Sequence, residues 1–139
     1  MTDPIDIVSS FCGLMEHRDA AALKHYLGED AVYQNVGMPA TVGADAIVAN
    51  LGQQFAVFPD SYAYEMINIA ASGDTVLTER LDMIKTPAGE LVGIPVMGTF
   101  VVHAGKIARW TDYWDTSLPM KMMTGEDVAG LLPSDYLSV

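Results

Sequence analysis

The chain has 139 residues, the size of one domain, and half of them are hydrophobic, so it can bury a core of its own. Seven basic against eighteen acidic residues give a formal net charge of -11. This charge excludes nucleic-acid binding, which needs basic residues to neutralise phosphates, and an anionic membrane surface would also repel the chain. We therefore expect a single domain over residues 1–139.

The sequence predicts a cytoplasmic protein with no disulfide, cofactor or metal. Cys12 is the only cysteine, and the N-terminal residues lack the basic and apolar segments of a signal peptide. No segment has about 18 unbroken apolar residues, so no membrane span is expected. His17, His25 and His103 lack metal-ligand spacing, and we find no Gly-rich phosphate loop and no serine nucleophile elbow.

Helix signals open the chain. Asp3 can cap a helix that begins at Pro4, and apolar residues then follow at helical spacing as far as Met15. A second, shorter helix is predicted from Ala20 to Leu27, and Gly28 is expected to stop it.

Strands dominate the rest of the chain. A first strand is predicted over Ala31–Val36, and a third helix over Ala44–Phe55. Four more strands are expected, over Tyr62–Ala70, Thr75–Lys85, Glu90–His103 and Lys106–Asp115. Pro95 and Gly98 suggest a bulge or bend inside the third of these four.

The order of the elements predicts the fold class. Helices followed by a meander of long strands are typical of an α+β domain. Helices packed on one face of a bent antiparallel sheet would leave a conical hollow, which is where an apolar ligand would bind.

The polar residues that share a strand face are the candidates for chemistry. Alternate residues of a strand point to the same side, so Arg80 and Asp82 point together, and Asp112 shares its side with Trp110 and Trp114. A carboxylate on so apolar a face is costly unless it is paired, and a guanidinium can bond two carboxylates at once. In such a cluster one carboxyl pKa would rise, which would provide a general acid beside a general base.

Simpler interpretations of the same residues remain open at this point. Arg80 and Asp82 could form a solvated surface pair, because Glu79 places charge on the other face of the strand. Asp112 could be a buried structural acid. Tyr33 and Asn35 also share a strand face, but these residue types are ordinary in strands and at their ends.

Several motifs resemble the limonene-1,2-epoxide hydrolase family. They are Tyr33-Gln34-Asn35, Glu79-Arg80-Leu81-Asp82, the stretch 93–100 and Trp110-Thr111-Asp112-Tyr113-Trp114-Asp115. The resemblance covers roughly residues 5 to 115 and does not extend into the tail from Thr116. It implies a cone-shaped fold like that of nuclear transport factor 2, also called SnoaL-like, and a homodimer.

The resemblance also implies a role for each polar residue. Asp112, Tyr33 and Asn35 would hold one water, and Asp112 would take its proton. Asp82 would protonate the epoxide oxygen as the ring opens, and Arg80 would bridge the two aspartates. Water would thus add to a small or medium apolar epoxide, cyclic or terpene-like, in one step. Met38, Phe58, Met83, Met97 and Trp114 are candidates to shape the pocket.

Two other functions are compatible with a cone of this kind. One is an enzyme like ketosteroid isomerase or a polyketide cyclase, which uses an acidic base in an apolar cavity. Arg80 argues against it, because an arginine would lower the pKa of that base. The other is a non-catalytic module that binds an apolar ligand, since fold alone does not imply function. Two aspartates in the floor of a binding pocket argue against the module.

Overall fold

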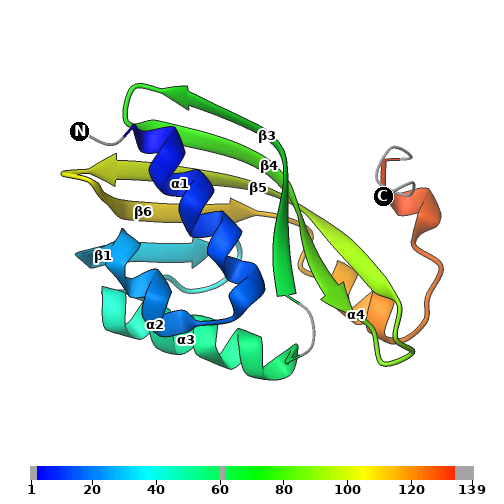
Figure 1. Cartoon of the computed structure of the whole chain (residues 1–139). Helices are drawn as coiled ribbons and strands as arrows, with labels where there is room; N and C mark the ends of the chain where they lie inside the picture. Colours follow the sequence, from blue (N-terminus) through cyan, green and yellow to red (C-terminus); the bar gives the residue numbers. More distant parts are fainter. Residues whose placement is uncertain (1–2, 60–61, 134–139) are drawn as a thin grey trace.

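The computed structural model describes residues 3–59 and 62–133, which form an α+β domain of helices packed on one mixed sheet (Figure 1). The helices are α1 (Pro4–Gly13), α2 (Ala20–Leu23), α3 (Ala44–Val57) and α4 (Leu118–Met123), with short 3-10 turns at Leu14–His17, Lys24–Tyr26 and Ala129–Leu131. The strands are β1 (Leu27–Asn35), β2 (Thr41–Val42), β3 (Tyr62–Ser72), β4 (Thr75–Lys85), β5 (Leu91–His103) and β6 (Lys106–Tyr113).

The sheet brings its early strand β1 beside its last strand, β6. Its strand order is β2-β1-β6-β5-β4-β3, and β1 runs parallel to β6 while every other pair is antiparallel. In Figure 1, α1 crosses the sheet, α2 and α3 lie beside β1, and α4 lies near the far arm of β4 and β5. This arrangement is the cone that the element order predicts, and it places the ends of β1 and β6 side by side.

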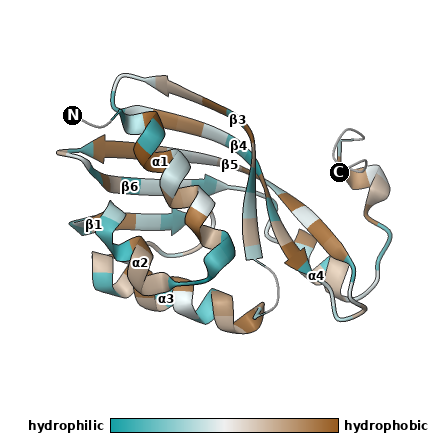
Figure 2. Cartoon of the chain, viewed as in Figure 1, coloured by the Kyte–Doolittle hydropathy of each residue, from teal (hydrophilic) through white to brown (hydrophobic). Residues whose placement is uncertain are grey.

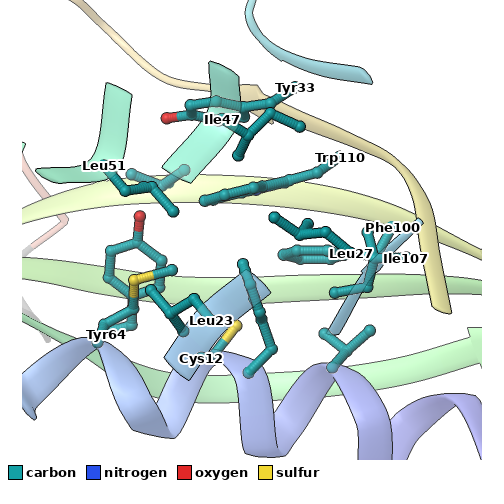
Figure 3. Close-up of a cluster of buried hydrophobic side chains, with 14 of the residues drawn as sticks. Cys12, Leu23, Leu27, Tyr33, Ile47, Leu51, Tyr64, Phe100, Ile107 and Trp110 are labelled. Carbon is teal, nitrogen blue, oxygen red and sulfur yellow. The ribbon is translucent and has the colours of Figure 1, made fainter. Parts of the chain in front are cut away.

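The core is aromatic at its centre. Trp110 stacks on Tyr33 with ring centroids 4.0 Å apart and on Phe100 at 5.6 Å (Figure 3). Phe11 from α1 meets Trp110 edge-on. Each of these aromatic side chains is buried. In Figure 2, hydrophobic residues recur along β3, β4 and β5 between paler and hydrophilic ones.

The prediction for Gly28 was wrong, and that for Pro95 and Gly98 was wrong as regards a bulge, although β5 does bend along its length (Figure 1). Gly28 does not stop a helix, because β1 already begins at Leu27, which is buried and pairs with Ile107 of β6. Gly98 and Pro95 form no bulge against β4, since the pairing from Lys85–Leu91 to Thr75–Val101 runs without a shift. The irregularity in β5 lies between Val101 and Val102, against β6.

The presence of a proline and a glycine inside β5 is explained by the strands beside each of them. Pro95 lacks an N–H group and pairs with Leu81 of β4, but β6 pairs with β5 only from Met97 onward, so the other side of β5 is an edge at Pro95, where proline is tolerated. Gly98 lies in the middle of the sheet, paired with Thr78 on one side and Asp112 on the other.

None of the helices within residues 3–59 and 62–133 has the length and apolar character of a membrane-spanning helix.

Candidate active site

A cavity of about 370 Å³ opens between α3, the end of β1 and the strands β3 to β6. Its wall contains Tyr33, Asn35, Met38, Asn50, Gln54, Phe58, Tyr62, Tyr64, Asp82, Ile84, Ile94, Val96, Asp112, Trp114 and Pro119. A cavity of this size lies within the range of small-molecule sites, roughly 300–1,000 Å³. Most of the wall is apolar or aromatic, and the two aspartates lie together in it.

Arg80 connects the two aspartates. Its Nε donates to Oδ1 of Asp82 at 2.7 Å and its Nη2 to Oδ2 of the same residue at 3.2 Å. Nη2 also donates to Oδ2 of Asp112 at 2.7 Å, and Nη1 donates to Oδ1 at 3.1 Å. The Arg80 side chain is 0% exposed. The surface-pair interpretation is therefore wrong, and the side of β4 that carries Arg80 and Asp82 is the inner one.

Further contacts hold this cluster in place. The guanidinium carbon of Arg80 lies 4.2 Å from the centre of the Tyr64 ring, a cation–π geometry. The indole Nε1 of Trp110 donates to Oδ1 of Asp112 at 2.8 Å. Thr78 is fully buried and accepts from Nη1 of Arg80 at 3.4 Å. The charged groups are thus paired and hydrogen-bonded, which is the condition for burying them.

Gly98 provides the space for the ion pairs. A Cβ atom on this residue would lie 2.4 Å from Nη1 of Arg80 and 2.8 Å from both Oδ1 of Asp112 and Oγ1 of Thr78. Any larger residue would push the guanidinium away from the carboxylate. Glycine is required at this position by the close approach of the two charged groups.

The two aspartates have different environments. Burial raises the pKa of Asp82 to about 6, against the opposing effect of the Arg80 guanidinium, and the charge of Asp112 adds to the rise. The side chain of Asp82 is 17% exposed, into the cavity, whereas that of Asp112 is 3% exposed. Burial works against the charge of Arg80, but the two carboxylates outweigh it and raise its pKa, so the guanidinium stays protonated. Near neutral pH a fraction of Asp82 can therefore keep a proton beside a permanent cation.

Tyr33 and Asn35 reach the site because β1 lies beside β6. Tyr33 pairs with Trp110 and Asn35 with Asp112 across the two parallel strands. Nδ2 of Asn35 donates to the Tyr33 hydroxyl at 3.1 Å, and the indole of Trp114 donates to Oδ1 of Asn35 at 2.8 Å. Burial raises the pKa of Tyr33 to about 12, so its hydroxyl keeps its proton.

A second polar group, on α3 and β3, was not predicted from the sequence. Nε2 of Gln54 donates to Oδ1 of Asn50 at 2.8 Å and to the Tyr33 hydroxyl at 3.5 Å. The Tyr62 hydroxyl donates to Oε1 of Gln54 and lies 3.4 Å from that of Tyr64. The spacing of four residues between Asn50 and Gln54 places them on one helix face, and this was the available signal.

The methionines predicted for the pocket divide into two groups. Met38 lines the cavity, as do Phe58 and Trp114. Met83 and Met97 do not, so their assignment to the pocket was wrong. Both occupy odd positions of strands whose even positions face the cavity, as Asp82 and Val96 do. Met83 packs on the other side, near Gly93, and Met97 is 50% exposed.

Groups outside this cluster offer less chemistry. In residues 3–59 and 62–133, no group of three or more His, Cys, Asp or Glu side chains could hold a metal ion. Cys12 lies on the buried side of α1, and burial raises the pKa of its thiol to about 12, so it is not a nucleophile near neutral pH.

Comparison with known proteins identifies the family. The sequence model of the limonene-1,2-epoxide hydrolase catalytic domain matches residues 2–124. The chain belongs to the limonene-1,2-epoxide hydrolase family. The match ends within the tail that the motifs did not cover and includes every residue of the Arg80 cluster.

Individual relatives agree with this assignment. The chain is 31% identical to Epoxide hydrolase EphG of Mycobacterium tuberculosis over 128 residues, which are 91% of this chain and 83% of the relative. It superposes on a solved LEH-like epoxide hydrolase of M. tuberculosis with a TM-score of 0.72 and 29% identity, covering 92% of this chain and 94% of the other. These likenesses support epoxide hydrolase activity for the family member described here.

The fold is shared more widely than the activity. A putative polyketide cyclase of Xanthomonas campestris superposes with a TM-score of 0.70 at 22% identity, covering 86% of this chain and 96% of the other. Similarity at that level shows the fold alone, and the chain also superposes on an NTF2-like protein of Burkholderia pseudomallei with a TM-score of 0.76 at 14% identity, covering 89% of this chain and 99% of the other. The fold is therefore the one that the family resemblance implies. The choice between a hydrolase and another enzyme on the same cone therefore depends on the site and the family, not on the shape.

Proposed function

We propose that this protein hydrolyses a small or medium apolar epoxide to a vicinal diol by direct attack of water, with Asp82 as general acid and Asp112 as general base. The observation that carries the proposal is the bridge from Arg80 to both carboxylates in an otherwise apolar cavity. One carboxyl with a raised pKa beside one paired carboxylate provides an acid and a base a few ångströms apart.

The water is held on the Asp112 side. Asp112, Tyr33 and Asn35 all line the cavity, and their strands pair so that Asn35 lies opposite Asp112. A water between them donates one proton to the Asp112 carboxylate and directs an oxygen lone pair towards the epoxide. Holding the reacting atoms in line lowers the entropic part of the barrier.

Ring opening exchanges protons only among the water, the epoxide and the two aspartates. The water oxygen bonds to one epoxide carbon as the bond from that carbon to the epoxide oxygen breaks. Asp82 transfers its proton to the departing oxygen, which leaves as an alcohol, and Asp112 takes the proton from the water. A positioned acid and a positioned base each contribute roughly 10²–10⁴-fold. After turnover Asp82 is ionised and Asp112 protonated, and we expect Arg80 to assist the return of the proton.

The rest of the cavity indicates the substrate class. Phe58, Ile84, Ile94 and Val96 provide apolar surface, and the amides and tyrosines around Gln54 bond mainly to one another. A ligand with few polar groups therefore fits best, such as a cycloalkene or terpene epoxide. Arg80 argues against the isomerase alternative, because it stabilises the ionised aspartates and weakens them as bases towards carbon acids.

The test is a single-turnover reaction in ¹⁸O-labelled water, with enzyme in excess over limonene 1,2-epoxide or cyclohexene oxide. We expect labelled diol in the first turnover, because water attacks directly. A first turnover without label would indicate attack by a carboxylate and would overturn the mechanism. Asp112→Asn should abolish diol formation, whereas Asp115→Asn is the control, since Asp115 is exposed and its carboxylate accepts from Ser117, away from the cavity wall. Absence of diol from the wild-type chain with both epoxides would favour an isomerase or cyclase.

We also propose that the protein is a homodimer in solution. Leu77 of β4, Met97 of β5 and Tyr113 of β6 are exposed on the side of the sheet that faces away from Arg80 and Asp112. Met97 and Tyr113 pair across their strands, so this side offers adjacent apolar surface to a second chain. Sedimentation velocity over a range of concentrations tests the assembly. Leu77→Lys should shift it towards the monomer, and a monomeric wild type would refute it.

A further inference from the structure

The contact between Trp114 and Asn35 fixes which way the Asn35 amide points. An indole N–H can only donate, so the atom of Asn35 that it meets at 2.8 Å must be the carbonyl oxygen. The amide nitrogen then faces the Tyr33 hydroxyl, to which it donates at 3.1 Å. Trp114 directly follows β6, beside the end of β1, so this contact joins the last strand of the sheet to the first.

This orientation determines what the Tyr33 hydroxyl can do. A hydroxyl has two acceptor positions and one proton to donate. Asn35 and Gln54 both direct N–H groups at the Tyr33 oxygen, at 3.1 and 3.5 Å, and so occupy its acceptor positions. The remaining function of the hydroxyl is donation, and Tyr33 lines the cavity that holds both aspartates.

We propose that Trp114 is a positioning residue: its indole N–H holds the Asn35 amide so that the Tyr33 proton points to the attacking water. This inference rests on the proposed function. With the indole in place, the water accepts from Tyr33 and donates to Asp112 and to the second lone pair of Asn35 Oδ1. One lone pair of the water remains for the epoxide carbon.

Loss of the indole N–H reverses this pattern. The Asn35 amide can then turn over, and its oxygen takes the Tyr33 proton. An N–H group faces the water where an acceptor stood before, so one proton of the water loses its partner and the attacking lone pair loses its direction. The apolar surface of the cavity changes little when Trp114 is replaced by phenylalanine, so the defect should appear in kcat more than in KM.

A double-mutant cycle tests the coupling. Trp114→Phe should reduce kcat about 10- to 100-fold in the wild-type background and have little further effect in an Asn35→Leu background, because the amide that the indole orients is already absent. Phe58→Leu is the matched control, since Phe58 lines the same cavity and makes no polar side-chain contact that the structure records. It should act equally in both backgrounds and mainly on KM. An equal loss from Trp114→Phe in both backgrounds would reduce Trp114 to a wall of the pocket and overturn the inference.

A spectroscopic measurement separates this inference from the proposed function. The chain has two tryptophans, so an NMR spectrum of the ¹⁵N-labelled protein should contain two indole N–H signals. The signal that disappears in Trp114→Phe belongs to Trp114. Asn35→Leu should shift the Trp114 signal more than that of Trp110, which donates to Asp112 instead. An unmoved Trp114 signal would overturn the inference even in an active enzyme. Absence of diol with a shifted signal would instead refute the hydrolase proposal and leave the contact established.

Discussion

Gly98 and Arg80 lie so close together that a single added carbon on the glycine would fall 2.4 Å from a guanidinium nitrogen. The strand that carries Gly98 lies between the strands of Arg80 and Asp112. The ion pair therefore passes over a residue without a side chain, and its geometry depends on that gap.

Gly98→Ala should disrupt this geometry. We expect a loss of about 1–3 kcal/mol in the free energy of unfolding, as in other overpacked cores, together with a large fall in turnover as Arg80 leaves Asp112. Urea unfolding and diol formation measure the two effects. Gly13→Ala is the control, because a Cβ there meets nothing within 4 Å and the residue ends α1. A Gly98→Ala variant with unchanged turnover would show that the pair tolerates displacement.

Arg80 should be needed both for stability and for turnover. Arg80→Met leaves two buried carboxyl groups without their cation, and removal of one partner of a buried pair costs about 3–5 kcal/mol. Arg80→Lys keeps the charge but cannot bond two carboxylates in the same plane. The free energy of unfolding, measured at equilibrium, should therefore be larger for the wild type than for either Arg80→Lys or Arg80→Met. Undiminished turnover in Arg80→Lys would count against the bridge and against its part in returning the proton.

The activity should decline as the pH rises through about 6. A general acid acts in its protonated form, and the pKa of Asp82 is raised to about 6, so each further pH unit above it lowers the protonated fraction about tenfold. The pH profile of kcat/KM for cyclohexene oxide measures this limb. Its absence between pH 6 and 8 would show that another group supplies the proton.

The ionisation of Asp82 also makes the stability of the folded chain fall as the pH rises. The pKa of Asp82 is higher in the folded chain than its ordinary value of 3.8, so the folded state favours the protonated form. The resulting stabilisation is complete below about pH 4 and is lost as the pH rises through about 6. In Asp82→Asn this part of the pH dependence should vanish, which thermal unfolding between pH 4 and 7 would reveal. An identical pH dependence in both proteins would contradict the raised pKa.

Two methionines provide a test of the cavity. Met38 lines it and Met97 does not, although both side chains are about half exposed. Met38→Ala should raise KM for an apolar epoxide several-fold, because the substrate loses apolar contact area. Met97→Ala should leave KM unchanged. Equal effects of the two variants would mean that the substrate binds elsewhere.

The sequence predicts the bounds of some strands better than it predicts which strand face forms the site. The strand Thr75–Lys85 is predicted with its observed ends, because alternation and the flanking turns agree. Strand parity also pairs Arg80 with Asp82 correctly, but it cannot say which face of β4 is the inner one. That choice depends on the neighbouring strands, and only the resemblance to a family supplied it beforehand.

The errors have two physical origins. Gly28 and Gly98 were interpreted from local chemistry, whereas each is decided by a partner far along the chain. Met83 and Met97 are different, because each directly follows a residue that faces the cavity, and strand alternation alone places them on the other side. Gly98 resembles a bulge until Arg80 and Asp112 are seen on either side of it. Gln54 resembles an ordinary surface glutamine of a helix until Tyr33 and Tyr62 are placed beside it.

The parallel pairing of β1 with β6 also bears on how the protein matures. Asn35 and Trp114 are 79 residues apart in the chain, yet they share a hydrogen bond, and Asp112 arrives on the same late strand. Contacts between such distant segments form slowly, because a large loop must close first. Hydrolysis would thus begin only once the sixth strand has docked between β1 and β5, so the appearance of diol during refolding would time the closure of the sheet.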